Sequence, residues 1–336
     1  MSQTSKWLKK QTLYPKILIG DRAAAGCSKL FEAPPKDQSV WGGIEFDGPF
    51  RTFWKPQVEF IDEEEYSYDG VAQFPAGPDM NKGSDITREQ WVKNIDQCTA
   101  WIKQGLIEKV VIARRMTFDV PNIDPFDILR NLKGGIPYLL QLSPDVTFLG
   151  CTPERLFWRN DSTLYSEALA GTNQDLQQLL SSSKDRKEFE WVVSDIEEKL
   201  YHLCENVEKS GVGHKKTNEL YHLHQKISGT LKDGIRDHHI LDRLHPTPAM
   251  GGTPWCQAKK VIQKFEPFRR GFYSAPLGYS SPDCSEWIVA IRCALIVKNK
   301  MHLYSGTGIV EESDPYSEWE ELNQKCEAWL CKIPVC

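Results

Sequence analysis

A helix is predicted by the stretch Ser313-Asp-Pro-Tyr-Ser-Glu318-Trp-Glu-Glu321-Leu-Asn-Gln-Lys325, which continues to Leu330. Its first residue or the following aspartate can cap the free amides, and a proline fits the first turn because its missing N–H is not needed there. Apolar residues recur at three- and four-residue steps and define a core-facing stripe, formed by Trp319, Leu322, Cys326 and Leu330. Glu318, Glu321 and Lys325 line an adjacent strip, which we expect at the margin of the core.

These glutamates allow two interpretations. A half-buried carboxylate needs a cation, and Mg²⁺ accepts one or two protein carboxylates while keeping positions for water and an anionic substrate. Alternatively, Glu321 and Lys325 form an exposed ion pair one helical turn apart. The helix alone favours the ion pair, because charged strips usually face water. A metal site therefore needs support from elsewhere in the chain.

Composition excludes several classes of function. The chain has 336 residues, of which 40% are hydrophobic and 11% aromatic, enough to build a large core. A net charge of −5 without a Lys/Arg cluster argues against a nucleic-acid partner. We find no secretory signal and no apolar run of membrane-spanning length, so we expect a cytoplasmic protein that does not bind membranes. The ten cysteines form no C-x-x-C pair, and zinc-protease, P-loop and dinucleotide motifs are missing.

A capped helix followed by a buried strand is predicted upstream. Thr87 and Gln90 have the spacing of a capping box, and the helix ends at Gly105. The β-branched run of residues 106–115 then fits a buried strand, in which Lys109 has apolar neighbours. An amine in an apolar wall loses hydration, its pKa tends downward, and it can act as a base. A lysine that extends to solvent from an edge strand is the alternative.

Two glutamates in the middle of the chain are further candidates. Glu154 follows a proline at the exit of a predicted strand, where a scaffold can direct a carboxyl group into a pocket, although a surface glutamate is the simpler account. The small residues of 165–172 would let the backbone approach a ligand. Glu188 lies in the first turns of a long helix that begins at Ser183, where it can complement the helix dipole or join Glu321 at a metal ion.

The C-terminal half adds a candidate pocket wall and a buried cation. His222 lies in a segment predicted as strand or turn, where a hydrogen-bonded structural role is as compatible as catalysis. The Pro- and Gly-rich stretch 244–254 is too irregular for a helix or strand and too apolar for a solvated loop, so we interpret it as a pocket wall. Arg292 lies inside a predicted strand, 287–297, and must be paired with an anionic ligand or a buried acid. Residues 1–85 predict short strands, with a candidate boundary near 77–84.

Together these segments resemble the chorismate-utilising enzymes, and within that family the isochorismate synthases most closely. The resemblance covers about Thr87 to Lys325, and its motifs follow the family order. It is carried by Glu108-Lys-Val-Val-Ile-Ala-Arg-Arg115, Thr152-Pro-Glu-Arg-Leu156, Ala168-Leu-Ala-Gly-Thr172, Ser183-Lys-Asp-Arg-Lys-Glu188, Leu244-His-Pro-Thr-Pro-Ala249, Ala290-Ile-Arg292, Gly306-Thr-Gly-Ile-Val310 and the helix at Ser313. It implies a single-domain α+β fold for residues 1–336, with two large, mainly antiparallel sheets facing each other, helices outside, and the active site in a cleft between the sheets.

The resemblance implies the Mg²⁺-dependent conversion of chorismate to isochorismate. Lys109 would be the general base that activates water for attack at ring carbon C2, and Glu154 the general acid that protonates the departing C4 hydroxyl. Glu188 and Glu321 would hold Mg²⁺ against the ring carboxylate, with Glu318 close by or acting through water. The residues expected around the substrate are Thr172, His222, Ala249, Tyr273, Arg292, Gly306 and Lys325; among them Tyr273 and Arg292 would grip the enolpyruvyl carboxylate, Gly306 would offer backbone donors and Lys325 would complete the anionic pocket.

Three residues depart from the family pattern and bear on pocket shape: Phe189, Met250 and Ala275. Salicylate synthase, which would further expel pyruvate, is the nearest alternative activity. A catalytically silent chorismate-binding protein is the alternative from another class, and the retained acid and base argue against it. Ammonia-dependent relatives lack a lysine at the position of Lys109, so we expect no glutaminase partner. No heptad run points to self-association, and a monomer is the default.

Overall fold

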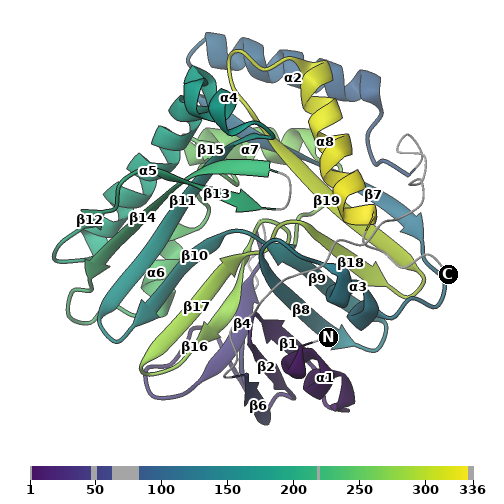
Figure 1. The fold of residues 1–336 in the computed structure, drawn as a ribbon, viewed down its shortest axis with the longest axis vertical. Helices are drawn as coiled ribbons and strands as arrows, with labels where there is room; N and C mark the ends of the chain where they lie inside the picture. Colours follow the sequence, from purple (N-terminus) through teal and green to yellow (C-terminus); the bar gives the residue numbers. More distant parts are fainter. Residues whose placement is uncertain (1, 47–50, 63–82, 218–219, 332–336) are drawn as a thin grey trace.

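The computed structural model describes residues 2–46, 51–62, 83–217 and 220–331. Within these ranges the chain forms two antiparallel sheets with helices packed around them, which confirms the predicted α+β fold (Figure 1). The nine-stranded sheet has, in spatial order, β15 (Gly252–Thr253), β7 (Lys109–Asp119), β19 (Lys300–Ile309), β18 (Cys293–Val297), β9 (Val146–Thr152), β8 (Ile136–Ser143), β1 (Lys16–Ile19), β2 (Arg22–Ala25) and β6 (Val58–Ile61).

The second sheet has ten strands within the described ranges. In spatial order these are β12 (Glu208–Lys209), β14 (Leu220–Thr230), β11 (Thr163–Asn173), β10 (Arg155–Asn160), β17 (Cys284–Val289), β16 (Pro276–Ser280), β4 (Val40–Ile44), β5 (Arg51–Lys55) and β3 (Lys29–Phe31), and β13 (Gly213–Thr217) pairs with β14 off this path. Short strands are expected in residues 1–85, and in the described part of this segment β1 to β6 are present between residues 16 and 61 and join both sheets. Most of the candidate boundary near 77–84 lies outside the described residues.

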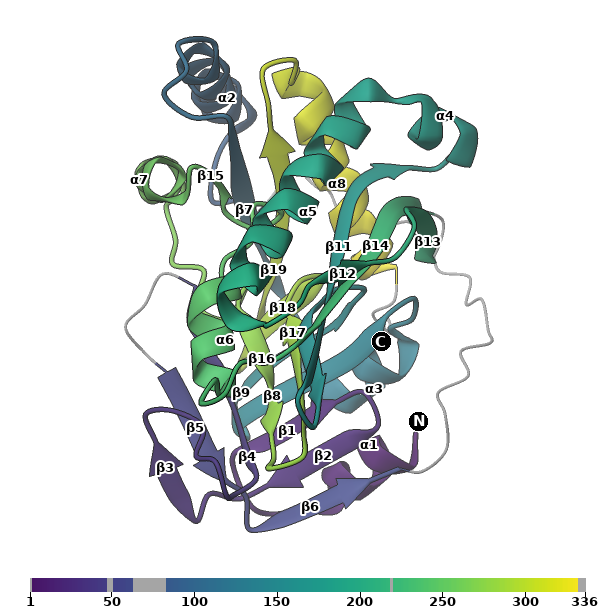
Figure 2. The ribbon, with the colours of Figure 1, turned by 90° about the vertical axis from the view of Figure 1, so that its left-hand side faces the viewer.

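Eight helices lie within the described ranges. They are α1 (Gln3–Lys10), α2 (Arg88–Lys103), α3 (Pro125–Asn131), α4 (Leu176–Ser181), α5 (Ser183–Leu203), α6 (Asp237–Leu244), α7 (Trp255–Phe265) and α8 (Pro315–Leu330). Helix α5 packs on β11 and β14, α7 on β7, and α8 on β19, with α2 outside α8 (Figure 2). No helix in the described part of the chain combines the length and apolarity needed to cross a bilayer.

Helix α8 forms as its sequence predicts. The Asp314 side chain caps it by accepting a hydrogen bond from the Ser317 amide at 2.8 Å. The predicted apolar stripe is buried along its whole length, and it packs against the nine-stranded sheet and α2. This packing fixes the face on which the glutamates of α8 are presented.

Two of the points at which the chain passes from one sheet to the other are adjacent in space. Glu154 lies between β9 of one sheet and β10 of the other, and Arg292 lies between β17 and β18. The backbone binds the crossings together, because the Val289 amide donates to the Glu154 carbonyl at 3.1 Å and the Cys151 amide donates to the Arg292 carbonyl at 3.2 Å. Both candidate site residues therefore lie where the sheets meet.

The prediction of one continuous strand through residues 287–297 is wrong. Arg292 has a φ of 52°, in the left-handed region that breaks a strand. The apolar run therefore divides into β17 and β18, which belong to different sheets. Periodicity could not reveal this change of sheet, because both halves are buried and apolar.

Candidate active site

Lys109 lies at the start of β7 and its side chain is completely buried. Its ammonium group contacts Glu188 on α5, with 2.6 Å between Nζ and Oε1. Gly308 on the neighbouring strand leaves room for this pair, because a Cβ there would lie 2.9 Å from Lys109 Cε and 3.1 Å from the Glu188 oxygen. The predicted position in an apolar wall is confirmed, and an outward-extending lysine is excluded. The contact with Glu188 joins the start of β7 to α5.

The predicted pocket wall lies directly beside this lysine. Thr253 of β15 is the register partner of Lys109. The wall is hydrogen-bonded to the chain on both sides of the lysine, from the Glu108 amide to the Thr253 carbonyl at 2.9 Å and from the Val111 amide to the Gly251 carbonyl at 3.0 Å. Ala249, within the wall, is half-buried and packs against the core under α5.

Glu154 is buried at the crossing between the sheets, with 4% of its surface exposed. Burial, and after it the nearby negative charge of Glu167, raise the pKa of its carboxyl group to about 8 against the opposing positive charges of Lys109, Lys215 and Arg292. A carboxyl group in this environment holds its proton at neutral pH, as a general acid must. The alternative of an exposed surface glutamate is excluded.

Arg292 and His222 form a hydrogen-bonded pair beside this acid. The distance between Arg292 Nη2 and His222 Nε2 is 3.2 Å, and His222 Nδ1 lies 3.1 Å from the Gly171 carbonyl oxygen. A guanidinium group can only donate, so Nε2 must accept and Nδ1 must carry the hydrogen donated to Gly171. Burial and the charge of Arg292 lower the pKa of His222 to about 4. The imidazole is therefore neutral, and it orients the arginine without cancelling its charge.

A second group of candidates surrounds Gly306 on β19. The Gly306 carbonyl accepts a hydrogen bond from Lys325 at 2.8 Å, and Lys325 also contacts Glu321 with 2.6 Å between Nζ and Oε1. Tyr273 is buried and stacks on Tyr304 with 5.1 Å between the ring centroids. A Cβ at Gly306 would lie 2.5 Å from the Tyr273 hydroxyl oxygen, so glycine allows this close approach.

These groups lie within electrostatic reach of one another. The charge of Lys109 affects the pKa of Glu154, and the charge of Lys325 affects that of His222. Thr172 lies in β11 directly after Gly171, whose carbonyl binds His222. The structure therefore brings the predicted base, acid and cationic residues to the region where the two sheets meet.

Glu318 does not lie at the margin of the core, as its position in the helix suggested, but inside it, with 3% exposed. Its Oε1 accepts a hydrogen bond from Ser313 at 2.8 Å, and its Oε2 accepts one from Thr307. These hydroxyl donors make burial of the carboxylate tolerable. No cluster of three or more His, Cys, Asp or Glu side chains within the described ranges is arranged to hold a metal ion, so the structure does not gather Glu188, Glu318 and Glu321 into one such cluster.

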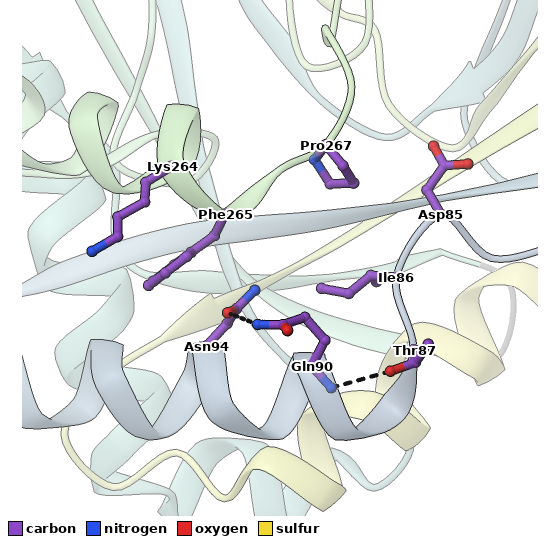
Figure 3. A pocket seen from close by; sticks show the side chains of 8 residues that line it. All are labelled: Asp85, Ile86, Thr87, Gln90, Asn94, Lys264, Phe265 and Pro267. Atoms are coloured by element: carbon purple, nitrogen blue, oxygen red, sulfur yellow. Dashed lines mark hydrogen bonds between the residues drawn. The ribbon is translucent and has the colours of Figure 1, made fainter.

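A separate pocket of about 570 Å³ lies at the start of α2 and the end of α7 (Figure 3). It is lined by Asp85, Ile86, Thr87, Gln90, Asn94, Lys264, Phe265 and Pro267. Its amide groups bind each other, since Gln90 Nε2 donates to Asn94 Oδ1 at 2.8 Å. None of the predicted site residues lines this pocket, so we do not assign it to the chemistry.

Sequence reasoning missed a charged cluster next to the acid, formed by the buried Glu167 and the partly exposed Lys215 and His224. Glu167 is 4% exposed and accepts a hydrogen bond from His224 at 2.8 Å. A sequence signal existed, because Glu167 interrupts a run of small and apolar residues in the manner of Arg292. Its neighbours could not be recognised, because they come from two other strands.

Comparison with known proteins gives a consistent result. The model of the family described as chorismate binding enzyme matches residues 55–333. The isochorismate synthase MenF of Haemophilus influenzae is 31% identical, over 95% of this chain and 86% of that protein. Its counterpart in Bacillus subtilis is 34% identical, over 85% of this chain and 66% of that protein.

Solved structures extend the comparison to the fold. The menaquinone-specific isochorismate synthase MenF of Escherichia coli superimposes with a TM-score of 0.86 at 25% identity, covering 99% of this chain and 92% of that one. Component I of anthranilate synthase from Streptococcus pneumoniae gives a TM-score of 0.75 at 18% identity, covering 90% of this chain and 82% of that one, and shows likeness of fold alone.

Proposed function

Because the chain belongs to the chorismate binding enzyme family, we propose that it is an isochorismate synthase, which converts chorismate to isochorismate. One observation carries the assignment beyond the family. The structure holds a completely buried lysine, Lys109, within electrostatic reach of a buried carboxyl group, Glu154, that keeps its proton at neutral pH. A base and an acid of this kind are what water addition at one ring carbon, with loss of a hydroxyl group as water at another, requires.

The proposed reaction uses these two side chains as proton carriers. Lys109 accepts a proton from the water molecule whose oxygen bonds to C2. The ring double bonds shift, the C4–oxygen bond breaks, and Glu154 donates its proton so that this oxygen leaves as water. One water molecule enters and one leaves, so the product is an isomer of the substrate. Arg292, oriented by His222, and Tyr273 would bind the enolpyruvyl carboxylate, Thr172 and Ala249 would contact the ring, and Lys325 would complete the anionic pocket.

We also propose that the enzyme requires Mg²⁺, held by Glu188 and Glu321. Their side chains are 21% and 40% exposed, respectively, and supply the carboxylate oxygens that Mg²⁺ prefers. The side chain absent at Gly308 leaves space beside the Glu188 oxygen. A bound Mg²⁺ would neutralise and orient the ring carboxylate of the substrate. Both oxygens of Glu318 already accept hydrogen bonds from hydroxyl groups. Glu318 would therefore contribute indirectly, by fixing the position of α8, which carries Glu321.

Replacing Glu321 with alanine should weaken both Mg²⁺ dependence and substrate binding. We expect the Mg²⁺ concentration for half-maximal activity and the KM for chorismate to rise by about 10-fold or more, as for loss of a metal-ligand contact. Glu320→Ala is the matched control on the same helix, because this exposed residue contacts Arg88 instead. Titration of activity with Mg²⁺ measures the effect, and a variant with full activity at unchanged Mg²⁺ demand would contradict the metal assignment.

Product analysis tests the proposed activity. Purified protein is incubated with chorismate and Mg²⁺, and the products are separated by chromatography at early times. Isochorismate as the first and main product is expected. Salicylate with pyruvate as the main early product would instead make the chain a salicylate synthase, and the absence of any product would favour a silent chorismate-binding protein.

The same proposal bears on partners and location. Water is the nucleophile, so the reaction needs no ammonia and no glutaminase subunit. We propose a monomer that acts in the cytoplasm on chorismate, with neither nucleic acid nor membrane as a partner. The proposal also treats residues 1–336 as one catalytic domain, in line with the strands that the first 61 residues contribute to both sheets.

A further inference from the structure

The turn that carries Glu154 is held from both sides by one cluster, in which the buried Glu167 contacts the partly exposed Lys215 and His224. On one side, the Arg155 amide donates to Glu167 Oε1 at 3.2 Å. On the other, Lys215 Nζ donates to the Pro153 carbonyl at 2.9 Å and lies 3.4 Å from the same Glu167 oxygen. The backbone immediately before and immediately after the acid is therefore fixed by a single ion pair. A short strand, β13, pairs with β14 and brings Lys215 to this point.

Glu167 keeps its negative charge in this position. Burial alone would raise the pKa of its carboxyl group, but the hydrogen bond from His224 and the charges of Lys215 and Arg155 lower it to about 2. It is therefore ionised throughout the pH range in which an enzyme of this kind would be assayed. Glu154 and Glu167 are two neighbouring carboxyl groups whose surroundings separate them into one acid and one anion.

The charges that face the Glu154 carboxyl come from several elements of the fold. Glu167 on β11 contributes negative charge. Lys109 on β7, Lys215 on β13 and Arg292 between β17 and β18 contribute positive charge. Positive charge favours loss of the proton from Glu154 and negative charge favours its retention. Without Glu167, the Glu154 carboxyl group would face only the positive charges of Lys109, Lys215 and Arg292 among these groups.

We propose that Glu167, held by His224 and Lys215, is a positioning residue that fixes the turn of the general acid and keeps that acid protonated. The inference rests on the proposed function, because it assumes that Glu154 donates a proton to the substrate. It adds a role that the resemblance to the family did not supply.

The pH dependence of kcat tests this role. An enzyme with a general acid loses activity as pH rises through the pKa of that acid, so the wild type should lose half of its kcat near pH 8. Glu167→Gln removes the negative charge but keeps the size of the side chain and an oxygen for the Arg155 amide. We call the pH at which kcat falls to half its maximum the alkaline midpoint. In this variant we expect the alkaline midpoint to move down by about one pH unit, so that kcat above the midpoint is about tenfold lower than in the wild type.

Glu286→Gln is the matched control. Glu286 contacts Arg155 Nε at 2.6 Å from the adjacent strand, is also mostly buried, and lies outside the proposed catalytic and binding residues. The alkaline midpoint of the Glu286→Gln variant should equal that of the wild type. A merely structural role for Glu167 would lower kcat equally at all pH values and leave the midpoint in place, and this result would overturn the inference.

Lys215→Met provides a second, opposite test that does not depend on the folding of the first variant. It removes a positive charge, so its alkaline midpoint should move to higher pH. A midpoint that stays fixed or moves down would contradict the inference. Failure of the proposed function is recognised separately, because wild-type protein would then form no isochorismate at any pH.

Discussion

Replacing Lys109 with alanine should abolish turnover while chorismate still binds. We expect kcat to fall about 10²- to 10⁴-fold, the usual contribution of a general base. The lysine is completely buried and contacts Glu188, and the 244–254 wall is hydrogen-bonded to the backbone on either side of it. Isochorismate formation gives kcat, and calorimetric titration with chorismate gives the affinity of the variant.

Lys109→Met is the matched variant, because it fills most of the same volume. Alanine at a completely buried site leaves a cavity that can cost about 2–5 kcal/mol of stability, whereas methionine avoids most of that cost. If both variants bind chorismate without turning it over, and Lys109→Met unfolds at a temperature similar to that of the wild type, the loss is chemical. Unchanged turnover in either variant would refute the role of Lys109 as base.

Replacing Glu154 should have the second large effect. Glu154→Ala and Glu154→Gln are both expected to lower kcat about 10²- to 10⁴-fold with chorismate binding retained, because neither side chain can donate the proton to the leaving oxygen. Glutamine is the sharper test, since it preserves the shape of a group that is 4% exposed.

The pH dependence of kcat gives the direction in which activity should change. Burial raises the pKa of Glu154 to about 8, so its acid form predominates below that pH and disappears above it. Wild-type kcat should therefore be retained below pH 8 and lost above it, whereas the residual activity of Glu154→Gln should show no alkaline loss near that pH. A glutamine variant that keeps the same alkaline loss would show that another group controls it.

Local sequence patterns predicted most of the elements. The capped start and apolar stripe of α8 and the apolar run of β7 each follow from the order of residues within one element, and the structure confirms them. The apolar run that follows Lys109 indicated that the lysine could be buried, but a lysine extending to solvent from an edge strand fitted the sequence equally well. Such patterns contain the information needed to define one helix or strand.

Features that depend on distant parts of the chain could not be predicted in this way. The break at Arg292 occurs because the chain changes sheets there, and the burial of Glu318 depends on hydroxyl donors from β19 and from the loop before α8. The cluster that holds the Glu154 turn is formed by Glu167, Lys215 and His224, which come from three strands, β11, β13 and β14. The groups that bind the side chains of Arg292, Glu318 and Glu167 all come from other parts of the chain.

Isotope labelling measures the central claim most directly. The wild-type enzyme is supplied with unlabelled chorismate in water enriched in ¹⁸O, and isochorismate formed at early turnover is analysed by mass spectrometry. If Lys109 activates water for attack at C2 and Glu154 releases the C4 oxygen as water, the new hydroxyl group carries ¹⁸O and the product is two mass units heavier. Isochorismate without the label would show that the hydroxyl oxygen is transferred within the substrate, and it would contradict this mechanism.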